Sequence, residues 1–115
     1  MPIALRTSEN AVRYADVALL ASILQDDLLA TSLREIYLKP LERDRDGGET
    51  IRKTLRAYFS ADRNLSSAGA LLGVSRRTVA NRLRDIEERL GRSLGPVAAE
   101  IEITLRADEL DRTNR

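Results

Sequence analysis

The 115-residue sequence contains no cysteine, no histidine and no tryptophan, and only four aromatic residues. Without cysteine and histidine, the chain lacks thiol nucleophiles, the commonest zinc ligands and the side chain most often used for proton transfer near neutral pH. We therefore expect no catalytic residue, no metal site, no cofactor and no enzymatic activity. No apolar run approaches the roughly 18 residues that span a bilayer, and no signal-peptide pattern opens the chain. A cytoplasmic protein without membrane contact is the expectation.

The residues that are abundant favour helices. Hydrophobic residues make up 43% of the chain and charged residues 32%, as in an ordinary globular protein. Alanine, leucine, arginine and glutamate dominate, whereas the β-branched and aromatic residues typical of strands are scarce. A chain of this length is long enough for one domain and too short for two ordinary ones. The composition therefore predicts an all-α fold.

The N-terminal part divides into a weakly patterned segment and two helices. Residues 1–15 have little periodicity and are interpreted as a poorly defined segment, either a frayed start of the chain or the remnant of an upstream domain. Over residues 16–41, Asp16 is a suitable N-cap, and leucines then recur at helical spacing. A second helix is predicted from Asp27 to Leu38, because Pro40 pushes the preceding residue away from helical angles. The charged residues 42–49 are predicted to form an exposed connector.

Residues 50–91 predict three helices separated by short breaks. The first carries an apolar stripe that begins at Ile51, and Asn64 or Ser66 caps the second. Gly73 ends the second helix, and Ser75 caps the third. The third has apolar residues at i, i+4, i+7 and i+11, followed by Gly91; they are Val79, Leu83, Ile86 and Leu90. This tri-helical core is too small to bury much apolar surface alone.

The last segment predicts a packing helix over residues 96–110. Gly95-Pro96 is interpreted as a break, and Pro96 suits the first position of a helix. We expect this helix and the N-terminal helices to pack against the tri-helical core and to complete a single hydrophobic core.

The turn at residues 73–75 joins a short helix to a longer one, which is the helix-turn-helix arrangement. Gly69 lies where the two helices cross closely. Alanine is expected to satisfy the same contact there without the roughly 1 kcal/mol cost of glycine in a helix. The longer helix, residues 75–90, is the candidate recognition helix, with its N-terminal half in the major groove.

The exposed side of residues 75–90 carries groups that suit nucleic acid. Arg77 and Asn81, with Arg76 beside them, are expected to read bases, because arginine pairs with guanine and asparagine with adenine. Hydroxyl groups, guanidinium groups and the amides of a helix start suit phosphate oxygens. The side chains expected to contact the DNA backbone are Ser66, Ser67, Ser75, Thr78, Arg82 and Arg84. The alternative is a solvated helix with surface pairs such as Arg84–Glu88 and Asp85–Arg89.

Charge is distributed unevenly along the chain. The net charge is −3 over residues 1–50, +6 over residues 51–92 and −2 over residues 93–115. A basic middle between acidic flanks suggests a polyanionic partner for the middle only. Seventeen of the nineteen cations are arginine, which suits bidentate contacts, although genomic base composition produces the same bias.

Residues 64–91, NLSSAGALLGVSRRTVANRLRDIEERLG, resemble the C-terminal helix-turn-helix domain of PucR/CdaR-type bacterial transcriptional regulators. The resemblance extends over residues 36–110, and the spacing is also similar to the DNA-binding end of the nucleoid protein Fis. It implies a sequence-specific DNA-binding domain and DNA contacts by Arg76, Thr78 and Arg82. Ala80 and Asn81 stand where many members carry arginine and tyrosine, which leaves the DNA sequence open.

The resemblance also implies partners beyond DNA. Such regulators respond to small metabolites through upstream domains, so an effector is expected only through a domain that is not present in this chain. One recognition helix makes few contacts, and a homodimer on two half-sites is therefore expected, with the acidic, leucine-rich N-terminal helices as the self-association surface. Double-stranded DNA as partner implies nucleoid association. Two alternatives stay open: a Fis-like architectural protein of low specificity, and a helical protein-interaction module without DNA binding.

Overall fold

The computed structural model describes residues 17–22 and 25–113, and this part of the chain is helical without strands. Residues 17–22 are helical, and the chain then continues through α2 (Asp27–Tyr37), the short 3-10 helix η1 (Lys39–Leu41), α3 (Glu49–Ser60), α4 (Leu65–Leu72), α5 (Arg76–Leu90) and α6 (Leu94–Thr113). The predicted all-α fold is therefore confirmed. The interpretation of residues 1–15 and the cap at Asp16 fall outside the described residues.

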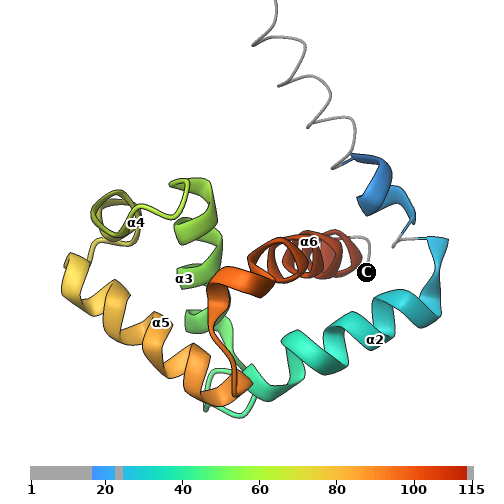
Figure 1. Cartoon of the computed structure of the whole chain (residues 1–115), viewed down its shortest axis with the longest axis horizontal. Helices are drawn as coiled ribbons and strands as arrows, with labels where there is room; N and C mark the ends of the chain where they lie inside the picture. The colour runs from blue at the N-terminus through green and yellow to red at the C-terminus, as the bar shows by residue number, and fades with distance from the viewer. Residues whose placement is uncertain (1–16, 23–24, 114–115) are drawn as a thin grey trace, which may run out of the picture.

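Helix α6 lies at the centre of the arrangement (Figure 1). On one side it packs against α3, which with α4 and α5 forms a three-helix unit, and on the other side it packs against α2. The η1 turn contacts both α2 and α5. The core therefore combines residues from η1 and from helices α2 to α6, and its most completely buried members are Leu38, Leu41, Leu55, Val79, Ile86 and Ile101.

Most predicted helix boundaries agree with the structure because the capping residues act locally. The carboxylate of Asp26 accepts from the backbone N–H of Leu29 and begins α2. Asn64, one of the two predicted alternatives, caps α4 by accepting from the N–H of Ser67 at 2.9 Å. Gly73 and Gly91 end α4 and α5 in the left-handed region, with φ of 72° and 69°. Glycine is favoured there since it has no Cβ to clash.

The predicted break at Gly95-Pro96 is wrong, because α6 begins two residues before the proline. The first N–H groups of a helix have no acceptor within the helix, so proline as the third residue of α6 removes no hydrogen bond. The carboxylate of Glu87, on α5, accepts from the N–H of Leu94 at 2.8 Å. A side chain of a different helix therefore sets the start of α6.

The predicted exposed connector at residues 42–49 is only partly exposed. Gly48 is buried at φ 87°, and a Cβ there would lie 2.9 Å from the carbonyl oxygen of Leu41. Asp46 is exposed, yet its carboxylate accepts from the N–H of Gly48 and from both the N–H and the hydroxyl of Thr50. The connector is thus an ordered cap for α3.

The expectation that alanine would serve as well as Gly69 is also wrong. A Cβ at Gly69 would lie 2.6 Å from the carbonyl oxygen of Val74, in the turn between α4 and α5. Real Cβ atoms are not found this close to a backbone oxygen, and here the neighbouring atom cannot rotate away. Glycine is required because the backbones of the helix and the turn are in direct contact.

Replacement of Gly69 by alanine is expected to lower the free energy of unfolding by about 1–3 kcal/mol, since overpacking outweighs the gain in helix propensity. Gly95→Ala is the matched control, because no atom lies within 4 Å of the position that a Cβ would take there, and it should raise the stability by about 0.5–1 kcal/mol. Urea unfolding measures both. A gain in stability for Gly69→Ala would contradict the close contact.

Asp46 is expected to titrate well below its ordinary range. The hydrogen bond from the Thr50 hydroxyl, followed by that from the Thr50 N–H, lowers the pKa of this carboxyl to about 2. Since the folded pKa is depressed, ionised Asp46 stabilises the fold fully above about pH 4, and this contribution is lost as the pH falls towards 2. Carbon NMR titration of the carboxyl checks the value. Thr50→Ala should raise it, and an unchanged pKa in that variant would refute the assigned cause.

Candidate nucleic-acid interface

Helices α4 and α5 are joined by a tight turn and cross steeply. Only Gly73, Val74 and Ser75 separate them, and the N–H of Val74 donates to the carbonyl of Gly69 at 2.9 Å. Figure 1 shows α4 nearly end-on while α5 runs across the view. The predicted helix-turn-helix geometry is therefore present, and it turns one side of α5 towards the core and the other side towards solvent.

The inner side of α5 is the predicted apolar stripe. Val79 and Ile86 are completely buried, Leu83 is nearly so, and Leu90 is half-buried. These side chains pack in the same cluster as Leu55 of α3. The stripe fixes the rotation of α5 about its own axis, and with it the identity of the residues that face outward.

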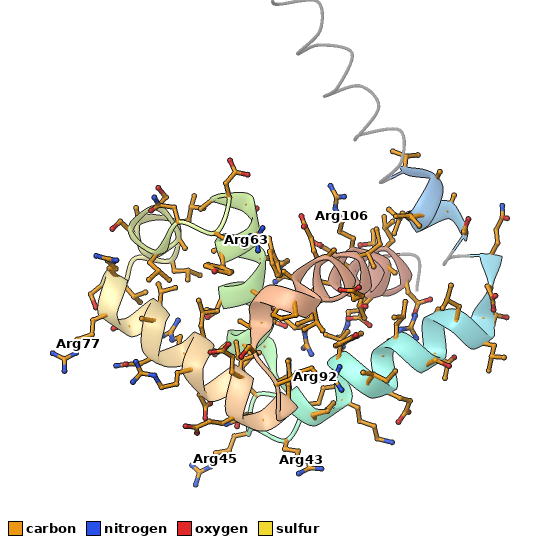
Figure 2. All side chains as sticks on the ribbon, viewed as in Figure 1. Arg43, Arg45, Arg63, Arg77, Arg92 and Arg106 are labelled. Atoms are coloured by element: carbon orange, nitrogen blue, oxygen red, sulfur yellow. The ribbon has the colours of Figure 1, made fainter. Side chains whose placement is uncertain are left out.

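The outer side of α5 presents the predicted base-reading groups. Arg77, Asn81 and Arg84 are all exposed, and Figure 2 shows Arg77 pointing away from the body of the molecule. Of the two surface pairs that the alternative interpretation expected, Asp85–Arg89 forms, with 3.2 Å between nitrogen and oxygen. Arg84 takes part in no ion pair within the described part of the chain. The guanidinium groups nearest the N-terminal end of α5 are therefore available to a ligand.

The start of α5 combines hydroxyl groups with free backbone amides. The Ser75 hydroxyl accepts from the N–H of Thr78 at 3.0 Å and lies 2.9 Å from the Thr78 hydroxyl. If the Thr78 hydroxyl donates in this contact, the hydroxyl hydrogen of Ser75 stays directed outward. The first N–H groups of the helix and the positive end of its dipole lie beside them. Ser66 and Ser67, also exposed, occupy the first turn of α4.

Arg82 is placed differently from the other predicted site residues. Its side chain is half-buried, and Nη1 lies 3.4 Å from the hydroxyl of Thr54 on α3. Sequence reasoning missed this inward direction, although the spacing contained the signal: Arg82 directly precedes the buried Leu83 and is three residues after Val79. Arg76, by contrast, is exposed.

The C-terminal end of α5 has a different electrostatic character from its start. Arg89 lies 2.8 Å from Asp44 of the connector and 3.2 Å from Asp85. The hydrogen bond with Asp44 raises the pKa of Arg89 above its already high ordinary value. The cation at this end is consequently used within the protein, whereas the cations at the start are not.

Other kinds of site find little support in the described residues. They contain no group of three or more acidic side chains that could hold a metal ion. Within the same ranges no helix is both long enough and apolar enough to cross a membrane. On the outer side of α5, Arg77, Asn81 and Arg84 are exposed, and none of them takes part in an ion pair or side-chain hydrogen bond with a residue that the structure describes.

Residues 51–107 match the family model described as the PucR C-terminal helix-turn-helix domain. The matched segment runs from the first turn of α3 into α6 and includes the whole helix-turn-helix. Comparisons with curated proteins and with solved structures gave no match.

Proposed function

Because residues 51–107 belong to the family of PucR C-terminal helix-turn-helix domains, we propose that this chain binds double-stranded DNA sequence-specifically in a transcription regulator, with α5 in the major groove. A major groove about 12 Å wide admits one helix. The observation that carries the proposal is the exposed, unpaired outer side of α5 opposite a fully buried stripe. Such a regulator acts on the nucleoid.

The roles of the side chains follow from their chemistry. The Arg77 guanidinium suits the O6 and N7 acceptors of guanine, and the Asn81 carboxamide suits N6 and N7 of adenine. Arg76 lies beside them at the start of the helix. These groups distinguish bases because the acceptor and donor pattern in the major groove differs for each base pair.

Contacts to phosphates would orient α5 without reading sequence. We assign them to Ser75 and Thr78 at the start of α5, to Ser66 and Ser67 at the start of α4, and to Arg84. Arg82 stays in this set through the guanidinium hydrogens that are not directed at Thr54, since arginine has five donors. The positive ends of two helix dipoles support the same assignment.

Two other functions compete with this proposal. A Fis-like architectural protein would bind DNA through the same fold with little preference for sequence, and excess competitor DNA would then displace it from any fragment. A protein-interaction module would not bind DNA at all. The unpaired Arg77 and Asn81 favour a base-reading role, because phosphate contacts alone need no carboxamide.

The double variant Arg77→Ala/Asn81→Ala is expected to bind its selected DNA site at least about 30-fold more weakly, since each of the two bidentate contacts contributes about 1–3 kcal/mol of discrimination. Binding to random DNA should fall much less. The site is first selected from random duplexes with wild-type protein, and affinities are then measured by fluorescence anisotropy. Both side chains are exposed, so circular dichroism should show an unchanged fold.

Lys53→Gln is the control for loss of positive charge, because Lys53 is exposed on α3 and belongs neither to the proposed reading surface nor to the groove of the proposed dimer surface. It should retain the wild-type affinity for the selected site. A folded double variant that binds the selected site as tightly as wild type would reject the proposed reading surface. Wild-type protein that selects no site would favour the architectural alternative.

We further propose that two copies bind together. A single α5 makes few base contacts, whereas a two-fold dimer reads two half-sites about 34 Å apart. The side of α2 opposite the core exposes apolar side chains, with Leu28 at 78% exposure and Ile36 at 48%. Next to it, a groove of about 340 Å³ runs between residues 17–22, α2 and α6, with Leu29 and Leu33 in its wall. A second copy that covers this apolar surface would remove it from water.

Leu28→Glu is expected to give a monomer by analytical ultracentrifugation at concentrations where wild type is a dimer, because a carboxylate would be buried without a partner. Circular dichroism should show an unchanged helical content, since the leucine is exposed on the monomer and its replacement disturbs no core packing. Leu71→Glu is the matched control: Leu71 is 65% exposed on α4, at the opposite end of the molecule (Figure 1), and should retain the dimer. A wild-type protein that is monomeric both free and on DNA would contradict the dimer.

A further inference from the structure

We propose that the connector between η1 and α3, residues 42–48, is a second DNA-binding element, in which Arg43 and Arg45 bind phosphates beyond the C-terminal end of α5. This inference rests on the proposed function, and it extends the interface to a segment whose sequence, Glu-Arg-Asp-Arg-Asp-Gly-Gly, carries a net negative charge. In the structure the carboxylates of the connector pair with groups of the protein, whereas its arginine side chains point towards solvent.

All three carboxylates of the connector are engaged within the protein. Glu42 lies 3.9 Å from the buried guanidinium of Arg52, and Asp44 lies 2.8 Å from that of Arg89. Asp46 accepts the hydrogen bonds that cap α3. A carboxylate paired in this way contributes little repulsion towards an approaching anion, because its field is offset by its partner.

The two arginines between these carboxylates have the opposite placement. Arg43 and Arg45 are exposed, and neither takes part in a hydrogen bond or ion pair with any residue that the structure describes. Figure 2 shows both pointing away from the body along one edge of the molecule. The outward surface of the connector is therefore cationic although its sequence is acidic.

The connector is fixed to the helix that we propose reads DNA. The ion pair between Asp44 and Arg89 joins it to the last turn of α5, and Asp46 fixes its other end to α3. Arg43 and Arg45 are consequently positioned relative to α5 by short, specific contacts on the residues beside them. Figure 2 shows Arg77 at one end of α5 and the two connector arginines beyond the other end.

The dimensions of B-DNA suit this arrangement. Arg77 and Arg89 are twelve residues apart, and at 1.5 Å per residue their separation along the helix axis is about 18 Å. The major groove is only about 12 Å wide, so with Arg77 over the bases the C-terminal end of α5 extends to the phosphate backbone at one side of the groove. Glu88 is exposed in the last turn of α5 and would repel a phosphate there. The positive charges of Arg43 and Arg45 beside that turn outweigh the negative charge of Glu88, so the local net charge is positive.

The test uses the whole chain with Arg43→Ser, Arg45→Ser and the double variant, and it measures affinity for the selected duplex over a range of salt concentrations. Each phosphate contact contributes about −0.9 to the slope of log K against log salt, so each single variant should reduce the slope by about 0.9 and the double variant by about 1.8. Affinity should fall by the same factor on selected and random DNA, because phosphates carry no sequence information. Lysine at both positions should restore most of the slope.

Lys53→Gln again controls for net charge and should leave the slope unchanged. A duplex truncated at the flank that the connector covers should bind wild type and double variant equally. A slope that the double variant retains, or that Lys53→Gln lowers as much as either single variant does, overturns the connector contact. If Arg77→Ala/Asn81→Ala still weakens binding in that case, only this inference fails; if wild type binds no duplex, the proposed function itself has failed.

Discussion

The backbone contact between Gly69 and Val74 is the constraint on which the rest of the interface depends. It consists of the N–H of Val74 donating to the Gly69 carbonyl, and of a Val74 oxygen that occupies the space a Cβ would fill. Contact of this kind leaves no room for adjustment, because backbone atoms cannot move to another rotamer. It therefore fixes how α4 crosses α5, and the buried stripe of α5 then fixes which side chains face outward.

The features predicted correctly from the sequence are those that local forces determine. The stripe of α5 follows from the helical period, and Asn64 and Ser75 cap their helices because each side chain reaches an N–H three residues ahead. The outer face of α5 was predictable for the same reason. Once the inner residues of a helix are known, geometry alone gives the outer ones.

The features that sequence reasoning missed involve contacts between different elements of the chain. The start of α6 depends on Glu87, the inward course of Arg82 depends on Thr54, and the direction of Asp44 depends on Arg89. No periodicity within one helix contains this information. The connector illustrates the consequence most clearly, since its alternating charges indicate a neutral to acidic loop until the partner of each carboxylate is known.

Helix α6 separates two neighbours, with α3 on one side and α2 on the other. Its buried residues accordingly extend beyond one stripe, and they include a threonine and an aspartate. Leu94, Ala98, Ile101, Leu105 and Asp108 share one side of the helix, and Thr104 and Ala107 widen that side. Asp108 ties α6 to α2, because it lies 3.6 Å from Arg34 of α2, and it also lies 2.8 Å from Arg112 of its own helix. A helix shared in this way has few positions that tolerate substitution, since a residue altered to suit one neighbour also changes the surface offered to the other. As such a domain diverges, substitutions in α2 and in α3 therefore have to be compatible with the same residues of the helix that lies between them.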